Sequence, residues 1–241
     1  MKKVIQYNTL RNFAYSNDKI CVHPIKGIIL NFRGLSNKEM IWEDEEVHVR
    51  FAKQGIIYLV PYYQPWCWMN DQTVAYVEEI LDVIMDKYDL RDDIPIVSSG
   101  GSMGGLGSIM YTLKAKRMPV ACVANCPVCD LLYLYTESPD LPRTLYHAYW
   151  HFEGTMEEAL RANSPLYVAS KLPDIDYYIF HCEEDKRVNK EMHSDRFVEE
   201  MKKHHRICYY SDPGRAHCDL SPEMRALSYQ LMENSIKGVK R

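Results

Sequence analysis

At residues 96–107 the chain reads IVSSGGSMGGLG, and the rest of the sequence can be placed by reference to this stretch. An apolar, β-branched run leads into it and a helix-periodic run leads out of it, with Ser102 at the corner. Five of the chain's eleven glycines lie between positions 100 and 107, where the backbone must turn without a clashing side chain. The pattern G-x-S-x-G at residues 100–104, between a strand and a helix, predicts a nucleophile elbow, a sharp turn that exposes the serine hydroxyl.

Strand-like and helix-like segments alternate on both sides of this turn. Strands are predicted at residues 4–14, 20–23, 27–32, 56–60, 94–98, 119–125, 177–180 and 206–210. Helices are predicted over about 36–54, 71–88, 106–113 and 189–203, and from Ser221 to the end of the chain. Strands that alternate with helices need parallel pairing and right-handed crossovers. The predicted class is therefore α/β, a mostly parallel central sheet with helices on both faces.

The length of 241 residues fits one domain, and we expect a single α/β domain over residues 1–241. Residues 130–170 break the alternation with two aromatic-rich runs and an acidic helix near 156–161, so we expect them to form a small cap-like insertion. Whether this insertion moves as a lid is left open by the sequence. The loop at 61–70 is too rich in aromatic residues and proline for a regular element and is a candidate pocket wall.

Composition excludes several classes of partner. The net charge of −4 argues against nucleic acid and anionic membranes, because the chain has no basic excess to neutralise phosphates. The N-terminus, Met1–Asn8, lacks the apolar core of a signal peptide, and no apolar run approaches the roughly 18 residues of a membrane span. Eight cysteines without regular spacing indicate thiols in a reducing compartment. We therefore expect a soluble, cytoplasmic protein with a small-molecule partner, and the oligomeric state stays open, a homo-oligomer included.

The chain also contains partners for the elbow serine. A serine hydroxyl attacks only when a base takes its proton, and that base needs an acid to hold its tautomer. Residues after the later parallel strands reach the same edge of the sheet as the elbow, which makes Asp185 the candidate acid and His217 the candidate base. Glu183 or Glu184 could take the place of Asp185. His181 competes with His217, but its position at a strand end is better explained by a structural role.

With these residues in place, the sequence resembles the α/β-hydrolase family, and within it the esterases and the catalytic domains of prolyl oligopeptidase-like enzymes. The resemblance covers roughly residues 20–238. It rests on the glycine-rich elbow, on residues 181–188, which are similar to the family motif H-G-x-x-D-x-x-V, and on residues 214–217. It implies a triad of nucleophile, acid and base formed by Ser102, Asp185 and His217.

The resemblance also implies an oxyanion hole from the backbone N–H groups of Leu35 and Met103. This sequence departs from the family pattern in two places. Arg33 precedes Gly34 where His-Gly is usual, which concerns substrate preference more than activity because the hole needs only backbone donors. Cys182 stands where the acid loop usually has glycine, which leaves the geometry of that turn open.

Aromatic and cationic side chains near these strand ends are candidates for substrate contact. The candidate substrate-binding residues are Arg33, Tyr62, Tyr63, Trp66 and Trp68. The aromatic residues could equally pack a cap onto the core, and a cap's inner face is commonly a pocket wall. The arginine could bind an anionic group of the substrate or form an internal salt bridge.

Two cysteines, Cys126 and Cys129, have the spacing of a redox or metal motif, but core packing after a strand explains them better. No second pair at zinc spacing exists and the histidines are scattered, so we expect no metal and no cofactor.

Three functions remain to be weighed. The leading hypothesis is a carboxylesterase-type serine hydrolase that cleaves a small ester through an acyl-enzyme on Ser102. The alternative is a prolyl oligopeptidase-like serine peptidase acting on short peptides, although the chain is too short to hold the gating β-propeller of the large members. A non-catalytic binding module of the same fold is the third. The acyl and alcohol specificity cannot be deduced from the sequence.

Overall fold

A computed structural model describes residues 4–239, so the ends of the expected domain, with Met1–Lys3 of the N-terminal segment, lie outside the described residues. Its centre is a seven-stranded sheet in the order β1-β3-β2-β4-β5-β6-β7. The strands are β1 (Ala14–Ser16), β2 (Gly27–Phe32), β3 (Ile56–Pro61), β4 (Ile96–Gly101), β5 (Ala121–Asn125), β6 (Asp176–Cys182) and β7 (Ile207–Asp212). Only β1 pairs antiparallel, with β3, in the sheet of the described residues, which confirms the mostly parallel α/β class.

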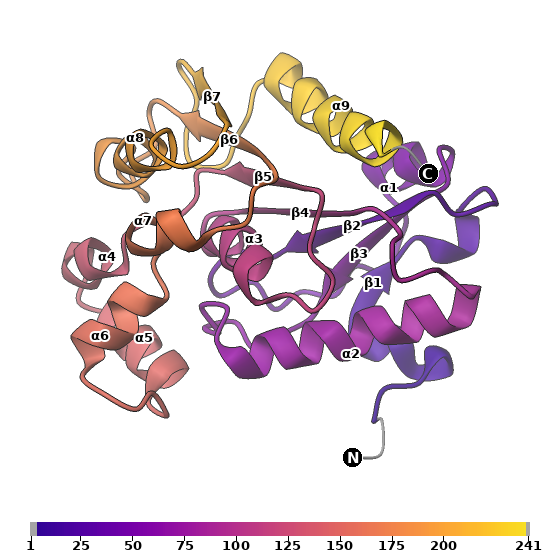
Figure 1. The fold of residues 1–241 in the computed structure, drawn as a ribbon, viewed down its shortest axis with the longest axis horizontal. Coiled ribbons are helices and arrows are strands. Elements are labelled where there is room, and N and C mark those ends of the chain that lie inside the picture. Colours follow the sequence, from indigo (N-terminus) through magenta and orange to yellow (C-terminus); the bar gives the residue numbers. More distant parts are fainter. Residues whose placement is uncertain (1–3, 240–241) are drawn as a thin grey trace.

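Helices cover both faces of this sheet (Figure 1). The α-helices are α1 (Glu46–Ala52), α2 (Asp71–Tyr88), α3 (Met103–Lys114), α4 (Leu131–Glu137), α5 (Leu141–Tyr149), α6 (Met156–Ala162), α7 (Pro165–Val168), α8 (Arg196–Met201) and α9 (Pro222–Gly238). Shorter helical turns are η1 (Tyr7–Asn12), η2 (Asp18–Ile20), η3 (Ala169–Lys171) and the π-turn η4 (Glu191–Asp195).

The core consists of two layers, one on each face of the sheet. Within β2, Ile28 and Leu30 pack into the layer that α2 and α3 cover, whereas Ile29 packs into the layer under α1 and α9. This alternation follows from the period of two along a strand. The sheet is therefore buried on both faces, as the continuous apolar runs of the sequence indicated.

The predicted helix at 71–88 is observed with the same bounds because both of its ends are capped. The side chain of Asn70 accepts a hydrogen bond from the N–H of Thr73, and Asp89 ends the helix with a φ of 50°. The helix presents Val77, Leu81 and Ile84 to the core.

Two predictions near the N-terminus were wrong. Of the strand predicted at 4–14 only Ala14 is in a strand, because Glu79 of α2 accepts the N–H groups of Val4 and Ile5 and the chain then turns through η1. The strand predicted at 20–23 is likewise absent, and η2 occupies its start.

The helix predicted over 36–54 is confined to α1, residues 46–52. Its start is set by a reciprocal cap in which the ring nitrogen Nδ1 of His48 accepts the N–H of Glu45 at 2.9 Å. The preceding segment stays irregular, and the hydroxyl of Tyr62 accepts the N–H of Ile41 at 2.8 Å. Residues 36–45 are therefore available to form one wall of a pocket.

Residues 131–168 fold into α4–α7 at one end of the sheet (Figure 1). Hydrogen bonds tie these helices to the aromatic loop: the indole of Trp68 donates to Thr144 at 2.9 Å, and the hydroxyl of Tyr149 donates to the carbonyl of Trp68 at 2.6 Å. The acidic helix predicted near 156–161 is α6. That this segment is a separate cap stays a prediction.

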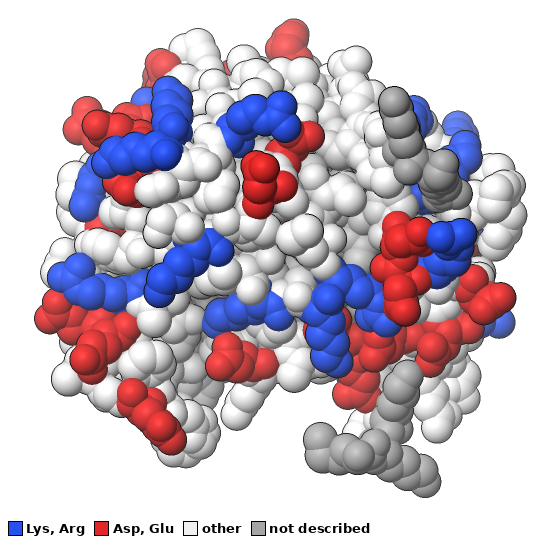
Figure 2. Space-filling view, in the orientation of Figure 1, with Lys and Arg blue, Asp and Glu red and all other residues white. Residues whose placement is uncertain are grey.

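The surface is of mixed charge on the face shown in Figure 2, where Lys and Arg side chains of the described residues lie beside Asp and Glu side chains. Among residues 4–239, none of the helices combines the length and the apolar character needed to cross a bilayer.

Candidate active site

Ser102 lies at the turn from β4 to α3. Its backbone has a φ of 59° and a ψ of −124°, a conformation that is rare for a residue with a side chain. The turn is held by hydrogen bonds from the N–H of Ser102 to Asn125 at 3.0 Å and from the N–H of Val128 to the Ser102 carbonyl at 3.3 Å. The flanking glycines are required here because a Cβ at Gly100 would collide with the carbonyl of Gly104, and a Cβ at Gly104 with that of Phe32.

Asp185 lies in the loop after β6, with its carboxylate buried and fully hydrogen-bonded. Oδ1 accepts the N–H groups of Arg187 at 2.8 Å and Val188 at 3.0 Å. Oδ2 lies 2.6 Å from Nδ1 of His217 and 3.4 Å from Nε2 of His181. Burial alone would raise the pKa of Asp185, but the hydrogen bonds from the two histidines and the two amides outweigh it and hold this pKa well below its usual range.

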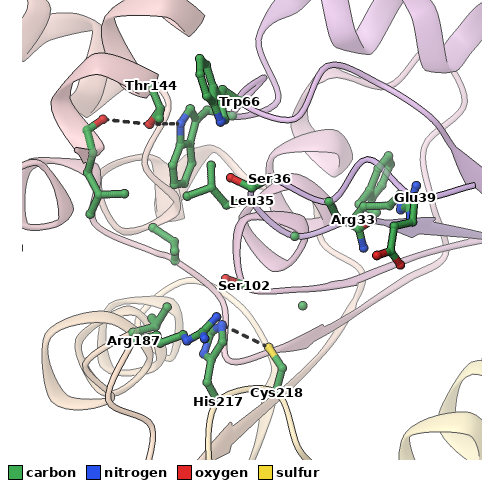
Figure 3. A pocket seen from close by; sticks show the side chains of 18 of the residues that line it. Arg33, Leu35, Ser36, Glu39, Trp66, Ser102, Thr144, Arg187, His217 and Cys218 are labelled. Atoms are coloured by element: carbon green, nitrogen blue, oxygen red, sulfur yellow. Dashed lines mark hydrogen bonds between the residues drawn. The ribbon is translucent and has the colours of Figure 1, made fainter. Parts of the chain in front are cut away.

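His217 follows β7 and faces Asp185. Because an ionised carboxylate can only accept, Nδ1 carries a proton and donates it to Asp185, so that in the neutral ring Nε2 is the nitrogen without a proton. Nε2 lies 3.7 Å from Sγ of Cys218. Within residues 4–239 no hydrogen bond joins Ser102 to His217, although both face the same pocket (Figure 3). Catalytic hydrogen bonds are often long or open in a structure without substrate.

The competing residues are occupied elsewhere. The ring of His181 is fully buried and contacts Ser194 at 2.7 Å and the carbonyl of Val188 at 3.1 Å, as expected for a structural residue. The carboxylate of Glu183 accepts the hydroxyl of Ser211 at 2.7 Å, and Glu184 is exposed. The structure thus pairs Asp185, and neither of these glutamates, with His217.

The two N–H groups predicted to form the oxyanion hole belong to Met103 and Leu35. Met103 is the first residue of α3, so its N–H has no acceptor within the helix. The loop after β2 passes over the elbow, since a Cβ at Gly34 would lie 3.9 Å from the Cβ of Ser102. In the described part of the chain the N–H of the next residue, Leu35, has no hydrogen-bond acceptor. That the two groups form an oxyanion hole stays a prediction.

A wide pocket of about 1780 Å³ contains Ser102 and His217 (Figure 3). Its walls come from the loop after β2, the irregular segment before α1, the helices α4 and α5, and the loop that carries Asp185. Trp66 and Trp68 line it, although the side chain of Trp68 is buried and donates to Thr144.

Two of the residues expected to bind substrate face elsewhere. Tyr62 and Tyr63 do not line this pocket among the described residues. The hydroxyl of Tyr63 bonds to the backbone N–H and carbonyl of Arg33, and that of Tyr62 to the backbone of Ile41. Both tyrosines therefore hold the backbone of pocket-lining residues and do not line the pocket themselves.

Arg33 lines the pocket with its guanidinium 5.3 Å from the ring centre of Tyr62. Its partial burial lowers its pKa. Within residues 4–239 it forms no ion pair, so the internal salt bridge considered from the sequence is not observed. Lys186, Arg187 and Cys218 also line the pocket and were not predicted from the sequence. Their positions directly after Asp185 and His217 could have indicated that they lie near the site.

The sequence matches the prolyl oligopeptidase family over residues 69–234, more than half of the chain. No curated protein is similar enough in sequence to count as a match. Among solved structures, the chain is similar to a puromycin-hydrolyzing peptidase of Mycobacterium tuberculosis, with a TM-score of 0.70 and 14% identity over 91% of this chain, but only 35% of that one. The chain thus spans about a third of that peptidase's length.

Two shorter proteins are similar over most of their length. A truncated carbohydrate esterase from gut microbiota has a TM-score of 0.67 and 13% identity, with 88% of this chain and 87% of that one covered. An S-formylglutathione hydrolase from Agrobacterium tumefaciens has a TM-score of 0.66 and 17% identity, with 90% and 84% covered. These likenesses establish the α/β-hydrolase fold, and the family match establishes the relationship: the chain belongs to the prolyl oligopeptidase family.

Proposed function

We propose that this protein is a carboxylesterase-type hydrolase that cleaves small esters through an acyl-enzyme on Ser102. The observation that carries the proposal is the 2.6 Å contact between Asp185 and Nδ1 of His217, a residue that lines the same pocket as Ser102. The loop after β6 supplies the acid and the loop after β7 the base, so the two are brought together by the parallel pairing of neighbouring strands.

The reaction begins when the ring of His217 turns from Cys218 toward Ser102. Nε2 takes the hydroxyl proton as Oγ attacks the ester carbonyl, and the carbonyl oxygen becomes an oxyanion held by the N–H groups of Leu35 and Met103. The imidazolium, stabilised by Asp185, then gives its proton to the departing alcohol. Water repeats the same steps on the acyl-enzyme and releases the acid.

Two of the similar structures favour an ester over a peptide. They are a carbohydrate esterase and an S-formylglutathione hydrolase, and this chain covers most of the length of each. A puromycin-hydrolyzing peptidase is similar as well. The family match nevertheless keeps a peptidase as the second candidate.

The test compares p-nitrophenyl acetate and butyrate with aminoacyl p-nitroanilides under identical conditions. We expect turnover of the esters, and loss of that turnover and of fluorophosphonate labelling in Ser102→Ala. Ser170→Ala is the matched control, because Ser170 is exposed on η3, outside the pocket. Faster cleavage of the anilides would favour the peptidase, and a wild-type protein that neither turns over substrate nor labels would indicate a binding module.

A further inference from the structure

The ring of His217 lies next to two cysteines. Cys126 follows β5 and Cys218 follows β7, and in the fold Sγ of each and a ring nitrogen of His217 all lie within 4.8 Å of one another. The separation of Nε2 and the Cys218 sulfur is 3.7 Å. Neighbouring sulfur and nitrogen ligands of a tetrahedral Zn²⁺ ion are about 3.5 to 3.8 Å apart, given metal–ligand bonds of about 2.3 and 2.0 Å. The three atoms therefore need only small shifts to share one ion.

The contact with Asp185 selects the tautomer of His217 that binds metal through Nε2. Histidine ligands coordinate through an unprotonated nitrogen while the other nitrogen donates its proton to a carboxylate or carbonyl. In this protein Asp185 accepts that proton at 2.6 Å, so Nε2 is the ligand atom. A second group of three, in which His181 and Asp185 join Cys126, lacks this property because both ring nitrogens of His181 are occupied by Ser194 and Val188.

The backbone around the two cysteines positions their sulfur atoms to bind a metal ion. Sγ of Cys126 accepts two N–H groups, from Cys182 and Cys218, each at 3.4 Å. Amide donors of this kind stabilise a metal-bound thiolate from outside the ligand set. Cys218 has a φ of 58°, an uncommon backbone conformation for a residue with a side chain, and its sulfur borders the pocket.

We propose that Cys126, Cys218 and His217 form an inhibitory site for a thiophilic divalent cation such as Zn²⁺, with the fourth position open to the pocket. Binding forms two metal–sulfur bonds and one metal–nitrogen bond and releases two thiol protons to solvent, without a redox change. The lone pair of His217 is then engaged, and the base that the proposed function assigns to Ser102 is blocked until the ion is removed. Mg²⁺ and Ca²⁺, which prefer oxygen ligands, do not compete.

The experiment titrates the whole protein with Zn²⁺ or Cd²⁺ under a phosphine reductant in a non-chelating buffer. It follows both ester hydrolysis and the ultraviolet thiolate-to-cadmium charge-transfer band. We expect one equivalent of metal to produce the band and to inhibit the wild type, a chelator to restore activity, and Mg²⁺ to have no effect. Cys218→Ala should need at least about 10-fold more metal for both signals, relative to its own metal-free activity.

Cys208→Ala is the matched control, because Cys208 is an exposed cysteine on β7 outside the cluster, and it should respond like the wild type. His217→Ala is followed by the cadmium band alone, and we expect weaker binding. Unchanged metal affinity in Cys218→Ala, or relief of inhibition in Cys208→Ala, would overturn the site. The band tests the site even if the protein hydrolyses no ester, so failure of the proposed function is distinguishable from failure of this inference.

Discussion

Replacing Asp185 by asparagine should stop the reaction while preserving the fold, because the substitution changes which nitrogen of His217 carries the proton. Oδ1 of Asp185 accepts two backbone N–H groups and Oδ2 accepts from His217. The asparagine oxygen is therefore expected to keep the two amides, since turning the amide over would leave both N–H groups unsatisfied at about 1 to 3 kcal/mol each. The amide NH₂ then faces Nδ1.

A donor at that position makes Nδ1 the acceptor and moves the ring proton to Nε2. Nε2 can then no longer take the proton of Ser102. The same substitution in a serine protease triad lowers kcat by about 10⁴-fold. We expect a loss of about 10³- to 10⁴-fold here, which corresponds to about 4 to 5 kcal/mol of transition-state stabilisation.

The assay is kcat on p-nitrophenyl acetate, with thermal unfolding as the check that the variant is folded. Glu183→Gln is the control, because Glu183 is the neighbouring carboxylate and contacts Ser211. It should keep activity within about twofold, as expected for a surface substitution. A folded Asp185→Asn enzyme with more than a tenth of wild-type kcat, or an equal loss in Glu183→Gln, would refute the assignment of the acid.

Two further predictions concern stability. Trp68→Phe removes the indole hydrogen bond to Thr144 at 2.9 Å and should lower the free energy of unfolding by about 1 kcal/mol in a urea titration; an unchanged midpoint would mean that this bond does not hold α5 to the loop. Gly104→Ala places a methyl group against the carbonyl of Phe32 and should destabilise the protein by about 1 to 3 kcal/mol. Gly238→Ala is its control, since a Cβ there meets no atom within 4 Å, and equal unfolding curves for the two variants would contradict the steric argument.

Local patterns were enough for part of the fold. The elbow could be predicted because its glycines and its flanking strand and helix are contiguous, within residues 96–114. Helix α2 was predictable for the same reason, since its apolar stripe and the capping residue Asn70 are contiguous. The central strands carry unbroken apolar runs, which follow from burial on both faces of the sheet.

Longer-range contacts explain the failures near the N-terminus. Residues 4–14 alternate like a strand, but a carboxylate on α2 accepts the N–H groups of Val4 and Ile5. The helix expected from residue 36 begins only at 46, and the backbone of Ile41 is tied instead to the hydroxyl of Tyr62. Propensity describes a residue's own preference, and a partner far along the chain overrides it.

The sequence by itself determined the class of fold, the elbow with Ser102, and a short set of candidate acids and bases, because each of these can be recognised from a pattern of neighbouring residues. Only the tertiary structure decided that Asp185, rather than Glu183, contacts His217, that Tyr62 and Tyr63 face away from the pocket, and that two cysteines 92 residues apart meet beside the histidine. The physical reason is the order of the strands: parallel pairing of β5, β6 and β7 brings the loops at their carboxyl ends to one edge of the sheet, and no local pattern records which side chains then point toward one another.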